Sequence, residues 1–244
     1  MKKLVLLAAA ALMTVSASAQ TVQESKTFDN IYVGVNGGVA TKTTGHAWLK
    51  GLDPNAGLRI GRWFTPVVGL AVESNAYFSN KPYASTGTIV RFLNTSLLGT
   101  LNFSNWFGGY TGEPRSFEVI AVAGLGWGHL FGNTAEYKSF KQVNNLTSKL
   151  GLDFAFNFGS QKQFQFYVEP SINFAFLGQS KNKELVATGN ALNPVALADH
   201  QEYGYKAASQ AGQPAYNINN SFVQLNAGFI YKFANSNGTH NFTI

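Results

Sequence analysis

The last regular stretch of the chain alternates strictly between apolar and polar residues. From Ser221 to Phe233 the odd positions from 223 onward are apolar, whereas the even positions include Gln224, Asn226 and Lys232. A period of two places alternate side chains on opposite faces of a β-strand, so this stretch predicts a strand with one apolar and one polar face. Its last odd positions are aromatic, which is typical of a lipid-facing strand at the membrane interface. An amphipathic strand of a soluble β-sandwich fits this segment equally well, so the choice depends on the rest of the chain.

The same alternation recurs in seven earlier stretches, which makes eight predicted strands. Several of them have the roughly 9 to 11 residues that a tilted membrane strand requires, more than the usual 5 or 6 of a soluble sheet. The fifth stretch, Phe117 to Leu130, is the least regular, because Ile120 and Val122 interrupt the alternation. The pattern predicts an all-β fold, an eight-stranded antiparallel up-and-down transmembrane β-barrel over residues 30–233.

The N-terminus has the features of a signal peptide, residues 1–19. Two lysines precede the apolar run Leu4 to Met13, and Ala17 and Ala19 form a small-residue cleavage site before Gln20. The apolar run is too short for a transmembrane helix, which requires roughly 20 residues. The chain is therefore expected to be exported, with residues 20–29 as a polar periplasmic lead-in.

The composition agrees with a membrane barrel and excludes several other classes. Charged residues make up 12% of the chain, about half the usual share of a soluble domain, while aromatic residues reach 14%. The chain has no cysteine, so it can form neither disulfides nor a zinc–thiolate site. The net charge of +6 is scattered without a basic cluster, which argues against nucleic-acid binding. The four histidines lack metal-ligand spacing, and neither a metal nor another cofactor is expected.

The predicted connections between strands differ in length according to their number along the chain: the odd-numbered ones are long, and most even-numbered ones are short. Two of the even connections are tight turns, at Thr65-Pro66 and at Gly159 to Gln163, and only the link from Ser104 to Arg115 is longer. A barrel with an even number of strands and its N-terminus in the periplasm has long external loops and short periplasmic turns. Residues 234–244 then form a short periplasmic tail. The first, third, fifth and seventh connections are the expected external loops: 41–54, 79–88, 132–144 and 178–220.

The inward face of the predicted barrel collects charged residues. An eight-stranded barrel is just wide enough for its own side chains to fill it, so these groups are expected to pair. Asp153 and Glu169 fall at the same level on neighbouring strands, where two carboxylates repel unless a cation joins them or one is protonated. We interpret the set as an interior ion-pair network that fills the lumen, with a gate or ion path as the alternative. Paired carboxylates also occur in glycosidases, but a packed interior without a substrate cleft argues against catalysis, so no enzyme is expected. The expected network comprises Arg59, Glu73, Glu118, Lys149, Asp153 and Glu169.

The end of the last strand resembles the C-terminal assembly signal of bacterial outer-membrane barrels, carried here by Gly228, Tyr231 and Phe233. The whole mature chain resembles the transmembrane domain of outer membrane protein A-like proteins, and the segment from Phe229 to Phe242 looks like the barrel exit of the Bacteroides-type versions. The resemblance implies the barrel-assembly machinery as a partner. Family members commonly continue into a peptidoglycan-binding domain. No residue here matches that domain, so peptidoglycan anchoring is not carried over, and a barrel-only protein and a truncated sequence both stay open.

The function expected from this resemblance is a structural role in the integrity of the envelope, in the outer membrane. Outer-membrane lipid and lipopolysaccharide are the expected partners, and the external loops are exposed for surface contacts. Two alternatives stay open. One is a narrow or gated pore for ions or small solutes through the interior network. The other is an adhesin or host-contact protein that uses loop 178–220, whose Tyr203, Tyr205 and Tyr216 are candidate contact residues.

Overall fold

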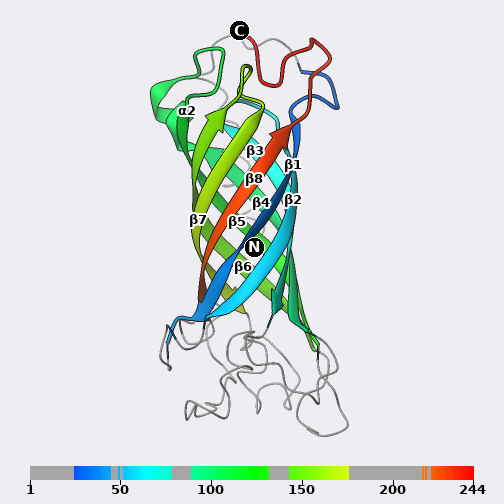
Figure 1. Ribbon diagram of the computed structural model, residues 1–244, viewed down its shortest axis with the longest axis vertical. Coiled ribbons are helices and arrows are strands. Elements are labelled where there is room, and N and C mark those ends of the chain that lie inside the picture. Colours follow the sequence, from blue (N-terminus) through cyan, green and yellow to red (C-terminus); the bar gives the residue numbers. More distant parts are fainter. Residues whose placement is uncertain are drawn as a thin grey trace, which may run out of the picture.

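The computed structural model describes residues 25–44, 49, 52–78, 89–131, 143–175, 216, 218 and 221–244. Eight strands, each antiparallel to its neighbours, form one closed barrel in chain order, and the ring closes where β1 pairs with β8 (Figure 1). The predicted eight-stranded up-and-down β-barrel is confirmed. The elements are β1 (Ile31–Lys42), β2 (Asp53–Trp63), β3 (Val68–Phe78), β4 (Val90–Asn102), α2 (Phe103–Gly108), β5 (Phe117–Leu130), β6 (Val143–Phe158), β7 (Phe164–Ala175) and β8 (Ser221–Lys232).

The barrel carries its apolar side chains outside and its polar side chains inside. Outward residues such as Leu58 and Leu225 are more than half exposed, whereas Arg59 between two outward neighbours is 1% exposed. This is the reverse of a soluble protein, and it is the arrangement of a wall that faces hydrocarbon. Every backbone group of a closed wall can pair with a neighbouring strand, which is why such a barrel can cross a membrane. The fold is therefore that of a transmembrane barrel.

Ile120 and Val122 do not break the alternation of β5, contrary to the sequence-based expectation. They are 2% and 1% exposed and lie inside the barrel, in step with Glu118. The expectation was wrong because it took every inward position to be polar or glycine. A narrow lumen accepts apolar side chains wherever they pack against one another.

Several predicted boundaries shift. β1 extends to Lys42 and β2 begins at Asp53, so part of the predicted loop 41–54 belongs to the barrel, because polar residues maintain a backbone ladder as well as apolar ones do. β6 likewise begins at Val143, inside the predicted loop 132–144. β8 ends at Lys232, although the amide of Phe233 still donates to the carbonyl of Ile31 at 2.9 Å.

The predicted turn-rich link between the fourth and fifth strands contains a short helix. β4 ends at Asn102, and α2 begins at Phe103, one residue before the predicted link that starts at Ser104. The side chain of Asn102 accepts a hydrogen bond from the amide of Asn105 at 3.0 Å and so caps the helix. None of the helices in the described part of the chain has the length and apolar character that a membrane-crossing helix requires.

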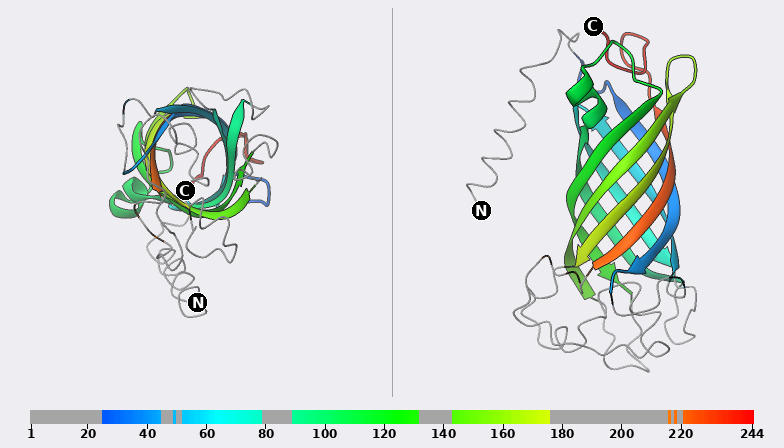
Figure 2. Two further views of the ribbon diagram at one scale, coloured as in Figure 1. Left: turned by 90° about the horizontal axis from the view of Figure 1, so that it is seen from below. Right: turned by 90° about the vertical axis from the view of Figure 1, so that its left-hand side faces the viewer.

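Both described ends of the chain lie at the same end of the barrel as α2, which we call the α2 end (Figure 1; Figure 2, right). The ring of strands is seen along its axis in Figure 2, left. The signal-peptide residues Ala17, Ala19 and Gln20 lie outside the described residues. So do loop 79–88, most of loop 132–144, and nearly all of loop 178–220, including Tyr203 and Tyr205.

Candidate functional site: the filled lumen

Five charged side chains from four strands meet in the middle of the lumen, and we call them the ion-pair cluster: Arg59, Glu73, Lys149, Asp153 and Glu169. All five are at most 3% exposed. Arg59 lies at its centre. Its Nε donates to Glu73 Oε2 at 2.7 Å and its Nη1 to Asp153 Oδ2 at 2.7 Å, and its Nη2 also pairs with Glu169.

Lys149 ties the same carboxylates together from β6. Its Nζ lies 2.5 Å from Glu73 Oε1 and 2.5 Å from Glu169 Oε1. Glu73 also accepts from the amide side chains of Asn75, at 2.7 Å, and Asn36, at 3.5 Å. Two cations thus face three carboxylates, and each carboxylate contacts at least one cation. Charges buried in this way are stable only when they are paired and hydrogen-bonded.

Strand register explains why these residues meet. Arg59 on β2 is directly paired with Glu73 on β3. Asp153 and Glu169 occupy facing register positions on β6 and β7, between the pairs Gly151–Ser171 and Phe154–Val168. The long Arg59 side chain crosses the lumen and contacts both of the carboxylates that were predicted to lie at the same level, Asp153 through Nη1 and Glu169 through Nη2.

Glu118 does not belong to the ion-pair cluster, although the sequence analysis included it. Its Oε2 accepts a hydrogen bond from Asn157 Nδ2 at 2.9 Å, close to the α2 end. Asn157 Oδ1 in turn accepts from Lys232 Nζ and Gln165 Nε2, both at 2.9 Å. Glu118 lies at the start of β5, near the α2 end, whereas the cluster lies deeper in the lumen. Sharing the inward face was therefore not enough to bring it into contact.

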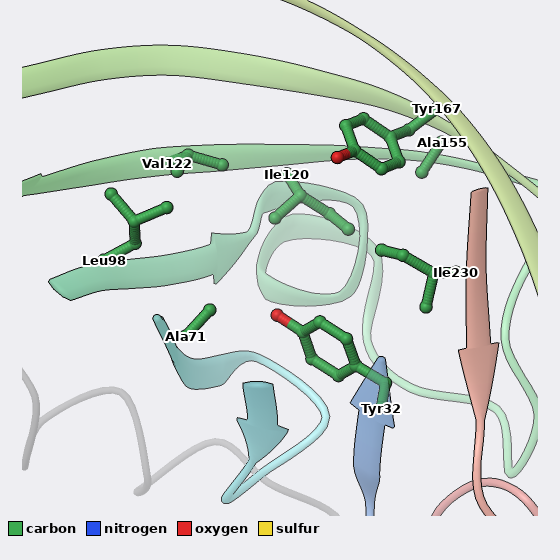
Figure 3. Close-up of a cluster of buried hydrophobic side chains, with 8 residues drawn as sticks. All are labelled: Tyr32, Ala71, Leu98, Ile120, Val122, Ala155, Tyr167 and Ile230. Atoms are coloured by element: carbon green, nitrogen blue, oxygen red, sulfur yellow. The ribbon is translucent and has the colours of Figure 1, made fainter. Parts of the chain in front are cut away.

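Between the ion-pair cluster and the polar side chains at the α2 end, such as Glu118 and Asn157, the lumen is filled by apolar side chains. Figure 3 shows eight buried side chains from seven strands, which we call the apolar cluster. The guanidinium of Arg59 lies over the ring of Tyr167, 4.8 Å from its centroid, and so joins the two layers. The apolar cluster comprises Tyr32, Ala71, Leu98, Ile120, Val122, Ala155, Tyr167 and Ile230.

Two inward tyrosines of the apolar cluster each lie against a glycine on the next strand. Tyr32 is paired with Gly61, and Tyr167 is paired with Gly228. A Cβ added at either glycine would overlap the tyrosine ring, so only glycine admits these rings. Gly228, expected to belong to an assembly signal, therefore also has a packing role in the folded barrel.

Toward the end opposite α2, three buried aromatic rings pack together inside the lumen. Tyr77 packs against Phe92 and Phe222, with ring centroids 5.6 and 5.5 Å apart. The hydroxyl of Tyr77 donates to Gln224 Oε1 at 2.6 Å. This layer was not predicted from the sequence. The signal was present, because Tyr77 shares its strand face with Glu73 and Phe222 shares its face with Gln224.

The C-terminal residues fold over the α2 end of the barrel instead of extending away from it. Asn235 Oδ1 accepts from the amide of Asn30 at 2.7 Å, and Asp29 Oδ1 accepts from the amide of Ser236 at 2.8 Å. Tyr110 Oη donates to the carbonyl of Phe242 at 2.9 Å, and burial raises the pKa of this phenol, which keeps it a neutral donor. Residues 240–242 of this segment line part of a partly open cavity of about 40 Å³ at the mouth, with room for a few water molecules.

The outward residues of the predicted assembly signal lie at the same end. Tyr231 packs against Phe164 and Phe233, with centroids 5.6 and 5.4 Å apart, and Phe233 is 45% exposed. These rings belong to an aromatic rim of the kind that lies at a membrane interface. Within the described residues, no group of three or more His, Asp or Glu side chains is arranged to hold a metal ion.

No protein-family model and no curated protein sequence matches the chain. Among solved structures, the chain is similar to the crystal structure of Neisserial surface protein A, with 11% identity, coverage of 84% of this chain and 98% of that chain, and a TM-score of 0.47. A major outer membrane protein from Thermus thermophilus gives 10% identity, 83% and 98% coverage, and a TM-score of 0.43. The N-terminal β-barrel domain of Pseudomonas aeruginosa OprF gives 14% identity, coverage of 83% of this chain and 97% of that chain, and a TM-score of 0.41. At these identities the fold itself rests on the strand ladders, and the resemblance to Bacteroides-type members stays a sequence-based prediction.

Proposed function

We propose that this protein is a sealed outer-membrane barrel with a structural role in the integrity of the envelope. The observation that carries the proposal is the filling of the lumen along its length. From the α2 end inward, the C-terminal segment, the polar contacts around Glu118 and Asn157, the apolar cluster, the ion-pair cluster and the aromatic layer of Tyr77, Phe92 and Phe222 follow one another. Each layer joins several strands, so among the described residues the filling ties the wall together and places side chains across the path along the barrel axis.

The membrane location is supported by the exterior. Large apolar side chains on all eight strands are exposed, among them Leu58 on β2, Leu97 on β4 and Leu125 on β5. A soluble protein does not expose such a continuous apolar surface, whereas a barrel wall in lipid requires it. An exported chain with this wall belongs in an outer membrane, with the α2 end in the periplasm. Lipid and lipopolysaccharide are then its partners, and the barrel-assembly machinery acts through Gly228, Tyr231 and Phe233.

The membrane location is tested by fractionation and by heat modifiability. The protein is expected in the outer-membrane fraction, and unboiled samples should migrate differently from boiled ones, because closed barrels resist unfolding in cold detergent. Recovery as a soluble periplasmic protein without a gel shift contradicts the proposal.

The sealed lumen is tested by conductance in planar lipid bilayers. The native protein is expected to give no stepwise channel currents, because buried ion pairs and aromatic rings occupy the path. Steady unitary currents that change on substitution of Glu169→Gln would instead favour the pore alternative. Leu97→Gln, on the outer face, is the matched control, since it changes a side chain that does not border the lumen.

A further inference from the structure

The outer wall formed by β6, β7, β8 and β1 varies in thickness along the barrel. Near the α2 end the row on β6, β7 and β8 is built of Phe156, Phe166 and Phe229, which face one another in the ladders, and it continues on β1 with Val35. Farther from α2 the corresponding row is built of Leu152, Pro170, Leu225 and Val39. Small aliphatic side chains thus follow a thick aromatic row, and the wall is recessed where they lie. β7, β8 and β1 lie side by side in Figure 1.

Pro170 adds to this recess. Proline has no amide hydrogen, so it cannot donate a ladder hydrogen bond to β6. The pairing of β6 with β7 is interrupted there, between Gly151–Ser171 and Phe154–Val168. The register is the same on both sides of the gap, so Pro170 interrupts the ladder without a bulge. Pro170 itself is exposed on the outer face, in the middle of the recess.

The recess is a groove of about 720 Å³ on the outside of the barrel. Aliphatic side chains line it, chiefly Leu150, Leu152, Pro170, Val223 and Leu225. It also includes Leu52, just before the start of β2, so it extends toward the end opposite α2. In the orientation proposed above, this part of the wall lies in the external leaflet.

We propose that this groove is a docking site for an acyl chain of an external-leaflet lipid. The groove is continuous with the apolar wall that faces the membrane, so lipid chains are the molecules that meet it. A second copy of the protein fits less well, because a two-fold interface would place one concave surface against another. A lipid chain is narrow and flexible and fits such an open recess, where it gains dispersion contacts with more side chains than a flat wall offers.

The inference rests on the proposed membrane location, and photocross-linking tests both. The protein is reconstituted in phosphatidylcholine vesicles that contain a small fraction of phosphatidylcholine with a diazirine in its acyl chain. After irradiation, labelled peptides are mapped by mass spectrometry. A handful of extra dispersion contacts predicts a roughly threefold excess of label on groove peptides of β6 to β8 over peptides of β3 to β5.

A groove-filling variant and a matched control separate docking from general exposure. Leu225→Trp fills the groove, whereas Leu125→Trp makes the same change on β5, and the two leucines are 52% and 53% exposed. The excess should disappear in Leu225→Trp and persist in Leu125→Trp, with both variants heat-modifiable.

Three results would overturn the inference. One is even labelling of the whole wall, and another is an excess that survives in Leu225→Trp. The third is efficient disulfide dimerisation of Leu225→Cys, which would show that a second copy covers the groove. This chain has no cysteine of its own, so that dimer reports on the groove alone. Failure to float with the vesicles would instead contradict the membrane location, and the docking with it.

Discussion

The ion-pair cluster and the apolar cluster fill neighbouring layers of the same lumen by different means. The ion-pair cluster depends on the number of partners, because each of its three carboxylates contacts Arg59, Lys149 or both. The apolar cluster depends on shape, since two tyrosine rings occupy spaces that only a glycine on the next strand leaves open. A charged layer is therefore most sensitive to the loss of one member, and an apolar layer to the addition of volume.

The largest effect is expected from Arg59→Ala in the ion-pair cluster. The substitution leaves Glu73, Asp153 and Glu169 with Lys149 as their only cation in the cluster. Removal of one partner of a buried ion pair lowers the free energy of unfolding by about 3–5 kcal/mol, and this variant should reach or exceed that range. Urea unfolding of the barrel in phosphatidylcholine vesicles, followed by tryptophan fluorescence, measures the change.

Arg62→Ala is the matched control for Arg59→Ala. Arg62 lies on the same strand, at the rim, where it donates to the backbone carbonyls of Asp29 at 3.1 Å and Lys26 at 2.9 Å. Loss of these bonds should lower the free energy of unfolding by about 1 kcal/mol or less. If both variants lose the same stability, the ion-pair cluster does not differ from a surface contact.

An intermediate effect is expected from Gly228→Ala in the apolar cluster. The added methyl group overlaps the ring of Tyr167 and must displace it, and overpacking of this kind costs about 1–3 kcal/mol. Gly99→Ala is the control, because its nearest contact would be the carbonyl of Ala123 at an ordinary 3.7 Å. Combining Gly228→Ala with Tyr167→Ala should remove the overlap, so a double mutant that shows simple additivity argues against the packing.

The contrast between the layers also explains what could be predicted from the sequence. The number of strands and the residues of the inward face could be predicted from the period of two. In a membrane barrel this period separates lipid-facing from lumen-facing side chains along the whole length of each strand. Inward charges such as Arg59 and Glu169 were conspicuous for the same reason. Inward apolar residues were not conspicuous in the sequence. Ile120 and Val122 resemble outward residues unless their positions along the strand are counted.

Contacts between distant strands could not be predicted from the pattern. Glu118 shares the inward face with Glu73, but its level along the barrel depends on the register of each strand with the next, which alternation alone does not give. The short helix α2 and the fold of residues 234–244 over the mouth depend on single hydrogen bonds, such as that between Asn30 and Asn235. Local polar sequences of this kind are compatible with many turns.

A smaller effect distinguishes the hydroxyl groups of two buried tyrosines. Tyr77→Phe removes the hydrogen bond to Gln224 and should lower the free energy of unfolding by about 1 kcal/mol. Tyr167→Phe should change it by less than about 0.5 kcal/mol, because the hydroxyl of Tyr167 has no hydrogen-bond partner among the described residues. The same urea unfolding assay compares them. An equal loss in both variants would mean that Tyr167 acts through its hydroxyl and not through the fit of its ring.

The smallest effect concerns a carboxylate outside the lumen, Asp29 at the α2 end. The hydrogen bond from the amide of Ser236 lowers the pKa of Asp29 below its ordinary 3.8. A lowered pKa in the folded state means that this contact stabilises the C-terminal segment above pH 3.8 and that the stabilisation is lost as the pH falls through the folded value. Hydrogen exchange of the Ser236 amide should therefore lose part of its protection on acidification. In Asp29→Asn the protection should be weaker near neutral pH and free of this step, whereas a step that persists in the variant would assign the titration to another group. The partners of Asp29 differ from those of the ion-pair cluster. The carboxylates of the cluster are held by Arg59 and Lys149, whereas Asp29 depends on the short segment 234–244 that folds over the mouth.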